Sequence, residues 1–289
     1  MIVPFSAGGG ADETARELAK HLSSVLHQPV VVDNRPGAGN FVAESFVARS
    51  PADGYTLLYD TSPFAVNAAL RRLAINLRQA LEPITLVVSA PMILVASPDI
   101  PAKDLAQFIK FVQSHPGEIS FASAGIGSAA HFAGESLNAM AGLDMLHIPY
   151  KGGPGAIADV MGNRVAIYFA SPVASQAHVK SGRLNALGVS SPSRLTEFPD
   201  VMTIAEAGLA NFDIQTWHGV FVPAGTPSEI KNKLNLAIKQ ALKDPEWKAK
   251  LDQQGYVIKD SSSQEFSTFI DDEMARWTKM AKERNIVLD

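Results

Sequence analysis

Short runs of β-branched and apolar residues alternate along this chain with longer segments in which apolar residues recur about every 3.6 positions. The short runs predict strands, and the longer segments predict amphipathic helices. Such alternation is typical of α/β proteins, so we expect mostly parallel sheets covered by helices. The predicted strands are residues 2–5, 30–33, 56–59, 84–96, 120–122, 145–149, 165–169, 185–189 and 219–222, and the predicted helices are residues 12–26, 42–48, 103–114, 128–141, 155–161, 173–180, 228–242, 245–253 and 263–285.

Two similar segments predict how the chain is divided into lobes. The segment "SPDIPAKDL" at residues 97–105 and the segment "VPAGTPSEI" at residues 222–230 each combine a strand exit, two prolines and an N-capped helix start. We interpret them as two crossings between lobes. The length of 289 residues also favours two domains. We therefore expect a discontinuous first lobe, residues 1–96 plus 223–289, and a continuous second lobe, residues 97–222.

Composition excludes several classes of function. The net charge of −4 and the absence of a basic stripe exclude nucleic acid as a partner. The chain contains no cysteine, so disulfides and thiolate catalysis are excluded, and no apolar run approaches the roughly 20 residues of a transmembrane helix. The seven histidines show no metal-ligand spacing. We expect neither a metal nor a cofactor.

The stretch "VPFSAGGGADETAR" at residues 3–16 places a glycine loop directly before a helix. The free backbone N–H groups and the dipole at a helix N-terminus attract anions. Capping of the helix by Asp12 or Thr14 is the simpler alternative. No Gly-Lys-Ser/Thr follows the loop, and "GAGNFV" at residues 37–42 lacks the third glycine of the dinucleotide fingerprint, so a nucleotide site is disfavoured. We interpret "RPGAG" at residues 35–39 as a turn with close helix–strand packing.

The same strand–loop–helix arrangement occurs twice more. In "FASAGIGSAAHFAGE", residues 121–135, the helix starts near Ser128, and "IPYKGGPGAIADVMGNRV", residues 148–165, carries Lys151 beside its glycines. Ser123 or Ser128 with His131 also suggests a Ser/His hydrolase. That alternative is disfavoured because neither serine lies in a G-x-S-x-G motif and no motif places an acid to orient the imidazole.

These blocks, together with "VVDNRPGAGNFVAESFVARSPADGYTLL", "SGRLNALGVSS" and "WHGVFVPAGTP", resemble in order and over nearly the whole chain the Bug family. Its members are the periplasmic solute receptors of tripartite tricarboxylate transporters. The resemblance implies a two-lobed α/β periplasmic-binding-protein fold (type II, Venus flytrap) with a ligand cleft between the lobes. It also implies a monomeric non-enzyme that captures a small organic acid in the periplasm for membrane subunits. The native precursor is then expected to carry a signal peptide ahead of the first strand.

The family holds its carboxylate through backbone amides, hydroxyls and ordered waters from loops of both lobes rather than through an arginine. Carried onto this sequence, the resemblance implies a set of ligand-binding residues in those loops. They are Phe5, Ser6, Gly8, Gly9, Ser62 and Pro63 in the first lobe, and Ser123, Ala124, Gly127, Ser128, Tyr150, Lys151 and Ser171 in the second.

One departure from the family bears on the ligand. Members often carry "VDxxFD" where this chain has "VAIYFA", so Ala166 and Ala170 replace two acids. Without an acid to pair with an ammonium group, a plain mono- or dicarboxylate is favoured over an amino acid. Aromatic rings near the expected cleft also allow an aromatic acid, and the sequence leaves aliphatic and aromatic ligands open. A ligand-sensing receptor for a signalling system remains an alternative to transport.

Overall fold

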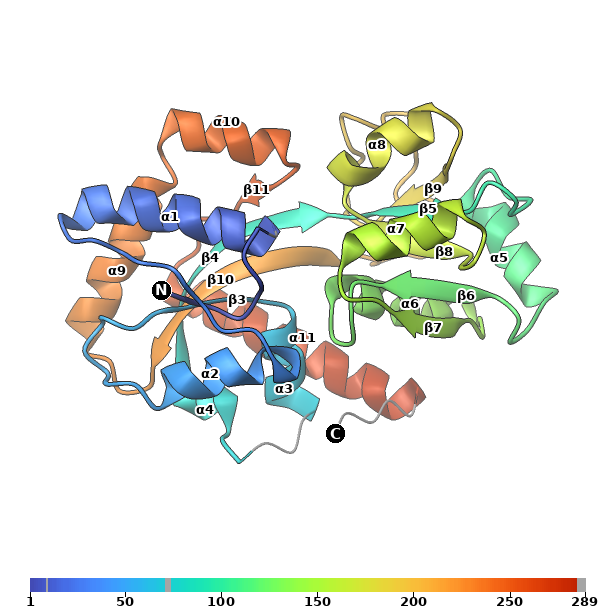
Figure 1. The fold of residues 1–289 in the computed structure, drawn as a ribbon. Helices are drawn as coiled ribbons and strands as arrows, with labels where there is room; N and C mark the ends of the chain where they lie inside the picture. Colours follow the sequence, from blue (N-terminus) through green and yellow to red (C-terminus); the bar gives the residue numbers. More distant parts are fainter. Residues whose placement is uncertain (9, 71–73, 285–289) are drawn as a thin grey trace. The chain divides into compact units, whose positions relative to one another are not determined.

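The computed structural model describes residues 1–8, 10–70 and 74–284. Within them the chain forms two compact units, each built around one β-sheet (Figure 1). The first unit contains Met1–Ser89 and Trp217–Ala281, and the second contains Ala90–Thr216. Gly9 and residues 285–289, which the sequence analysis assigns to the ligand site and to the first lobe, lie outside the described residues. Among the helices in the described ranges, none is both long enough and apolar enough to cross a membrane.

The sheet of the first unit has the order β11-β4-β10-β3-β1-β2. Strand β1 (Ile2–Val3) lies between β2 (Asp33–Asn34) and β3 (Leu58–Thr61) and is parallel to both. On the other side, β10 (Gln215–Pro223) is antiparallel to β3, and β11 (Val257–Ile258) is antiparallel to β4 (Leu81–Pro91). The helices of this unit are α1 (Gly10–Leu26), α2 (Phe41–Ala48), α3 (Pro63–Leu70), α4 (Leu77–Ala80), α9 (Ser228–Ala241), α10 (Pro245–Gln253) and α11 (Ser263–Arg284).

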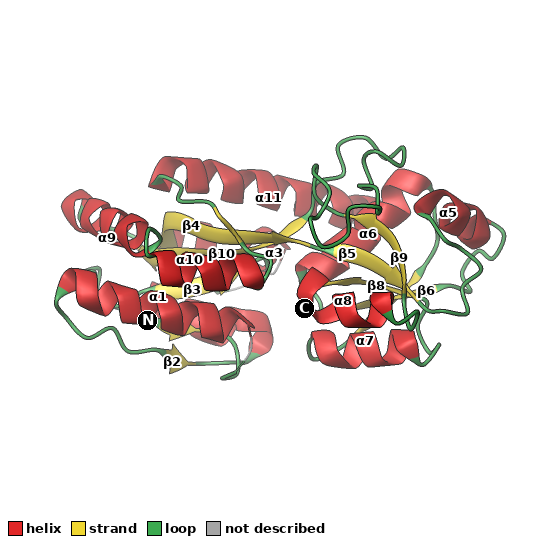
Figure 2. Cartoon of the chain, turned by 90° about the horizontal axis from the view of Figure 1, so that it is seen from above, coloured by secondary structure: helices red, strands yellow, loops and turns green. Residues whose placement is uncertain are grey.

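Strand β10 shows how this sheet is covered on both faces. Val220 and Val222 belong to the buried cluster that also contains residues of α1, α9 and α10. The alternate residues Trp217 and Phe221 pack on the other face, against Phe266 of α11, with ring centroids 5.8 and 5.1 Å apart. Because side chains of a strand point alternately to opposite faces, one strand supplies both cores. Figure 2 shows the sheet with α11 on one side and with α1 and α10 on the other.

The sheet of the second unit has the order β7-β6-β8-β5-β9. Strand β6 (Ser120–Ser123) is parallel to β7 (Leu146–Pro149) and to β8 (Ile167–Ala170). Strand β5 (Ile93–Ala96) is antiparallel to both β8 and β9 (Asn185–Val189). The helices are α5 (Leu105–Gln113), α6 (Ala129–Ala141), α7 (Gly153–Met161) and α8 (Pro172–Lys180).

Each strand and helix predicted from the sequence corresponds to an element of the structure, but three features differ. The sheets are mixed rather than mostly parallel, because β5, β10 and β11 run antiparallel to their neighbours. The single run predicted at residues 84–96 is divided into β4 and β5. The sequence analysis also missed α3, α4 and β11.

The chain passes from the first unit to the second between Ser89 and Ala90, and it returns to the first unit between Thr216 and Trp217. The sequence places the two crossings a few residues later, after residues 96 and 222. The predicted positions differ because they were taken from the proline-containing segments, and these segments lie where β5 and β10 end rather than where the units meet. Strands β4 and β10 extend across the two boundaries.

A glycine allows close packing of α6 on β6. A methyl group at Gly134 would lie 2.2 Å from Cε2 of Phe121, a fully buried ring. Overpacking of this kind typically costs about 1–3 kcal/mol, more than the gain of at most about 1 kcal/mol from replacing a helical glycine by alanine. We expect Gly134→Ala to lower the free energy of unfolding measured by urea denaturation. Adding Phe121→Leu should recover part of the stability lost in Gly134→Ala. If the effects of the two substitutions on the free energy of unfolding were strictly additive, the close contact between residues 134 and 121 would be contradicted.

Candidate functional site

In each unit, parallel strands bring their carboxyl ends to one edge of the sheet. Because β1, β2 and β3 are parallel, the segments that follow them start at the same edge of the first sheet. Open α/β sheets bind ligands at such edges. The first-unit residues predicted from the sequence lie in two of these segments: Phe5, Ser6 and Gly8 follow β1, and Ser62 and Pro63 follow β3.

The loop after β1 is organised by a carboxylate of the chain itself. Asp12, which is only 1% exposed, accepts hydrogen bonds from the Gly8 N–H at 2.9 Å, from Arg16 Nε at 2.9 Å and from Asn34 Nδ2 at 2.8 Å. Gly8 has φ +86°, a left-handed conformation suited to glycine. Asp12 therefore stabilises the loop that leads into α1. A role for Asp12 at the helix start was the simpler alternative to a ligand in the sequence analysis. The N–H of Gly8, predicted to face a ligand, is bonded to Asp12.

The N–H groups of the first turn of α1 remain as donors. The first residues of a helix have no acceptor within it, and the helix dipole favours an anion there. Gly10 begins α1, and a methyl group at Gly10 would lie 3.2 Å from the Tyr256 hydroxyl. The backbone at this turn is therefore close to a second polar group of the same unit.

A buried polar cluster fixes the inner face of that turn. Thr14 Oγ1 donates to the Gly10 carbonyl at 3.0 Å and accepts from the Tyr59 hydroxyl at 2.9 Å. Nδ1 of His218 lies 3.0 Å from both hydroxyl oxygens. Burial lowers the pKa of His218 to about 3, so its imidazole is neutral at physiological pH. Sequence patterns did not indicate this cluster, because its residues lie far apart in the chain.

The loop after β2 has an unusual backbone. Gly37, Ala38, Gly39 and Asn40 all have positive φ. Two side chains hold this conformation: Asn40 Nδ2 donates to Asp60 Oδ1 at 2.8 Å, and Asn67 Nδ2 donates to the Gly39 carbonyl at 2.6 Å. A methyl group at Gly37 would lie 3.2 Å from Val42. A turn with close packing, as interpreted from the sequence, accounts for these glycines.

Ser62 and Pro63 start α3 rather than forming an open loop. Ser62 is buried, and its carbonyl accepts hydrogen bonds from the N–H groups of Ala65 and Val66. Pro63 occupies the first helical position, where a missing N–H costs nothing. A Ser-Pro dipeptide suits such a helix start, but no helix was predicted here from the sequence.

The second unit repeats the arrangement. Because β7 and β8 both run parallel to β6, the segments after these three strands begin at one edge of the second sheet. The second-unit residues predicted from the sequence all lie at this edge. Ser123, Ala124, Gly127 and Ser128 are at or after the end of β6, Tyr150 and Lys151 follow β7, and Ser171 follows β8.

Ser123 and Ser128 have structural partners. Ser128 is the N-cap of α6 and accepts the His131 N–H at 3.3 Å. Ser123 is fully buried, and its hydroxyl donates to the Gly125 carbonyl at 3.0 Å. Its oxygen also lies 2.7 Å from Nε2 of His147, which can act as the donor. The hydrogen bonds of Ser123 therefore connect the loop after β6 to β7.

The two histidines do not form the arrangement that the hydrolase alternative requires. Nδ1 of His131 accepts the Gly127 N–H at 3.2 Å, and its ring stacks on His147 at 3.9 Å. Burial lowers the pKa of His131 to about 3, helped by His147, and burial lowers the pKa of His147 to about 4. Ser123 contacts His147 rather than His131, and the serine is inaccessible to a substrate. This arrangement positions a loop and does not activate a nucleophile.

The remaining predicted residues differ in whether their side chains are bonded to other residues of the chain. The Tyr150 hydroxyl donates to Asp159 Oδ2 at 2.6 Å, and the same carboxylate pairs with Arg164 at 2.6 Å. Lys151 and Ser171 are exposed. Ser171 is the N-cap residue of α8 without a side-chain capping bond, so its hydroxyl is available to a ligand.

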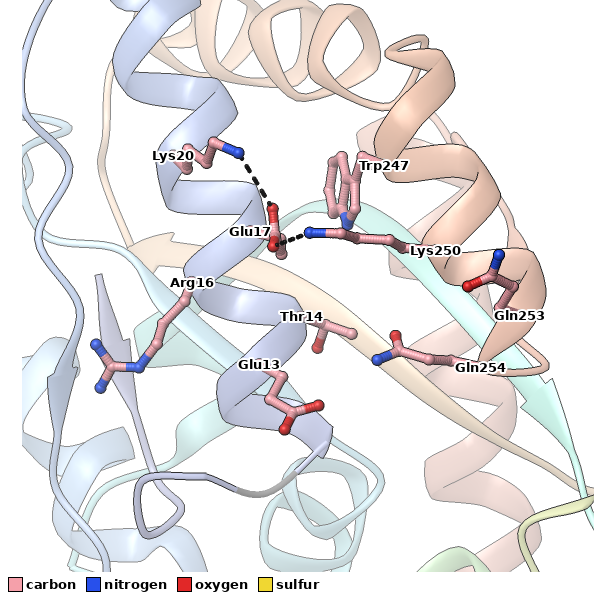
Figure 3. Close-up of a pocket in the computed structure, with 9 residues that line it drawn as sticks. All are labelled: Glu13, Thr14, Arg16, Glu17, Lys20, Trp247, Lys250, Gln253 and Gln254. Atoms are coloured by element: carbon pink, nitrogen blue, oxygen red, sulfur yellow. Dashed lines mark hydrogen bonds and ion pairs between the residues drawn. The ribbon is translucent and has the colours of Figure 1, made fainter. Parts of the chain in front are cut away.

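Figure 3 shows a charged pocket of about 520 Å³ in the first unit, between α1 and α10. Glu17 accepts from Lys250 at 2.7 Å and lies 3.9 Å from Lys20, while Arg16 is bonded to Asp12. These cations are paired with acids of the chain, so the pocket carries no excess positive charge for a carboxylate. Within the described residues no group of three or more His, Asp or Glu side chains could hold a metal ion.

The sequence profile of one protein family matches almost the whole chain. The family is described as the tripartite tricarboxylate transporter family receptor, and the match covers residues 14–286. The chain belongs to this receptor family. A curated relative, the protein BugT of Bordetella pertussis, is 37% identical over 286 residues, which cover 98% of this chain and 88% of BugT. The resemblance to the Bug family is therefore confirmed.

Solved structures of similar receptors share the fold. The periplasmic binding protein BugD is 31% identical, with a TM-score of 0.82 over 99% of this chain and 97% of BugD. A protein of R. palustris solved with adipate is 30% identical, with a TM-score of 0.86 over 99% and 97% of the two chains. MatC from Rhodopseudomonas palustris, solved with malate, is 29% identical, with a TM-score of 0.83 over 96% and 97%. The predicted two-lobed α/β periplasmic-binding-protein fold is confirmed.

Proposed function

We propose that this receptor captures a small organic carboxylate in the periplasm and delivers it to the membrane subunits of a tripartite tricarboxylate transporter. One observation carries the proposal: in each unit the predicted loops meet at the carboxyl edge of parallel strands, where helices begin. Two similar receptors were solved with the dicarboxylates adipate and malate. No chemical step is part of this function.

The donors that we propose for the carboxylate are the first-turn N–H groups of α1 and α6 together with hydroxyl groups. The ligand-binding residues implied by the family resemblance remain the proposed set, and each unit contributes the loops at the edge of its own sheet. Gly8 and Gly127 act in it by shaping their loops, since Asp12 and His131 accept their N–H groups. Ser128 and Ser171 supply hydroxyls, and Ala170, buried at the end of β8, offers no charge to a ligand ammonium. A carboxylate without an amino group is the ligand class that fits these donors.

Ser128→Ala is expected to weaken carboxylate binding about tenfold, because a hydrogen bond to a charged group is worth about 1.5–3 kcal/mol. Titration calorimetry with the tightest ligand from a thermal-shift screen of organic acids measures the change. The substitution also removes the α6 cap, so its folding is checked by thermal melting. Lys151→Met is expected to cost less, with Lys110→Met, an exposed lysine of α5, as its matched control. If Ser128→Ala kept full affinity and Lys151→Met lost binding, the ligand carboxylate would have to bind at the loop after β7 instead.

Delivery to a transporter is tested by uptake. Deleting the receptor gene or the genes of the membrane subunits is expected to abolish uptake of the labelled acid equally. Normal uptake in both deletion strains, with binding retained by the purified protein, would favour the ligand-sensing alternative.

A further inference from the structure

The second unit contains a groove between two of its helices. It has a volume of about 410 Å³ and runs between α7 and α8, which lie side by side in Figures 1 and 2. Its walls are mostly apolar and include three polar side chains. The lining residues are Gly153, Pro154, Ile157, Met161, Tyr168, Ser171, Ala174 and His178.

The groove begins at the edge of the sheet where the predicted ligand loops lie. Gly153 is the first residue of α7, and Ser171 immediately precedes α8, so both mark the carboxyl ends of β7 and β8. Met161 ends α7, and His178 lies in the last turn of α8. At 1.5 Å per helical residue, the groove extends about 12 Å from this edge.

Tyr168 supplies a free hydroxyl group inside the groove. Its side chain is 5% exposed, and its hydroxyl makes no hydrogen bond to any other residue that the structure describes. A methyl group at Gly153 would lie 3.2 Å from this oxygen, so the absence of a side chain there keeps the hydroxyl open. Burial raises the pKa of Tyr168 to about 12, which keeps the phenol protonated and able to donate. Nδ1 of His178 is likewise buried without a partner in the described chain.

We propose that this groove binds the apolar body of the ligand, an aromatic ring or an alkyl chain, while its carboxylate stays at the sheet edge near Ser171 and the Tyr168 hydroxyl. This inference rests on the proposed function and narrows its ligand class. An apolar cavity of about 150 Å³ already holds benzene, so the groove has room for a ring or for several methylene groups. The side chains of Ile157, Met161 and Ala174 would lose water contact only with such a ligand. A small hydroxy acid would leave these three side chains in contact with water.

Calorimetry with acetate, hexanoate and benzoate tests the groove. Wild-type protein is expected to bind hexanoate and benzoate at least about tenfold more tightly than acetate, since each buried methylene favours binding. Ala174→Leu places a larger side chain in the groove and should weaken hexanoate and benzoate binding about tenfold while leaving acetate unchanged. Ala177→Leu is the matched control, because Ala177 is exposed on the same helix and does not line the groove.

Tyr168→Phe provides a second variant that keeps the ring and removes the hydroxyl. It should weaken all three acids about tenfold, whereas Tyr55→Phe, at an exposed tyrosine of the first unit, should change nothing. Equal wild-type affinity for acetate and hexanoate would overturn the proposal that the groove binds the apolar body of the ligand, and it would leave the proposed function intact. An Ala174→Leu variant with unchanged hexanoate binding would do the same. Failure of the wild type to bind any organic acid would overturn both.

Discussion

Asp12→Ala is expected to lower the free energy of unfolding by about 2–4 kcal/mol. The carboxylate is almost fully buried and accepts hydrogen bonds from the Gly8 N–H, Arg16 and Asn34. Removing one partner of such a network leaves the others unpaired, which costs more than the network contributes when intact. Arg16 is half exposed and can turn to water, so most of the loss comes from the loop and from Asn34.

The loss is measured by urea denaturation at neutral pH. Glu13→Ala, at the exposed neighbour on the same helix, is the control and should change stability by less than about 0.5 kcal/mol. Burial opposes ionisation of Asp12, but hydrogen bonds from Arg16, Asn34 and Gly8 outweigh it and lower the pKa. The stabilisation is therefore present above the ordinary carboxyl pKa and is lost as pH falls through the lowered value. Equal stability of the two variants would show that Asp12 does not hold the loop.

The sequence predicted which elements exist because periodicity is a local property. Helix α1 buries Ala15, Leu18 and Leu22 at helical spacing, and this pattern is visible without the fold. Helix α3 was missed because Phe64, Ala65 and Val66 are all buried, so it has no polar face to reveal a period. Strand direction was not predictable, since β5 and β10 are placed by neighbours remote in the chain.

Local patterns were also sufficient to propose the loops of the candidate site, whereas the contacts within these loops could not be predicted from them. Glycines and serines after strands indicated loops that the structure places at the two sheet edges, and a ligand site in these loops stays a prediction. The contact of Ser123 with His147 joins residues 24 positions apart, and that of Thr14 with His218 joins residues 204 apart. His131 was the obvious sequence candidate because it lies on the same helix start. Only pairing of β6 with β7 brings His147 to Ser123.

The glycine loops also have a different role from the one the sequence suggested. Their N–H groups were expected to face a ligand, yet those of Gly8 and Gly127 bond to side chains four residues further along, Asp12 and His131. Each loop is closed by the first turn of its own helix. The glycines thus shape the loops that lead into the helices, and we propose the helix N-termini and nearby hydroxyls, rather than the glycine N–H groups, as the donors for an anion.

Between pH 4 and pH 8 the wild type is expected to lose stability relative to Asp60→Asn. Asp60 is fully buried, and its Oδ1 accepts hydrogen bonds from Asn40 Nδ2 and from the Thr61 N–H, whereas its Oδ2 has no hydrogen-bond partner among the described residues. A buried carboxyl oxygen without a hydrogen-bond partner favours the protonated, neutral form of the group. Burial raises the pKa of Asp60 to about 7 from an ordinary 3.8, so the folded chain keeps this carboxyl group protonated at pH values where the unfolded chain does not.

The sign follows from the raised value. The folded chain binds a proton that the unfolded chain releases near pH 4, so the stabilisation is complete below pH 4 and is lost as pH rises through about 7. An asparagine at position 60 can still accept from Asn40 and Thr61 through its oxygen, and it has no proton that titrates in this range. Its contribution should therefore not depend on pH.

The measurement is the difference in unfolding free energy between wild type and Asp60→Asn across this range. A difference is needed because the lowered pKa values of His131, His147 and His218 act in the opposite direction on both proteins as pH falls. Asp272→Asn, at an exposed aspartate of α11, is the matched control and should run parallel to the wild type. A difference that stays constant from pH 4 to pH 8 would mean that folding does not raise the pKa of Asp60. The Asn40 loop beside β2 would then be anchored by an ionised Asp60 at every pH in this range.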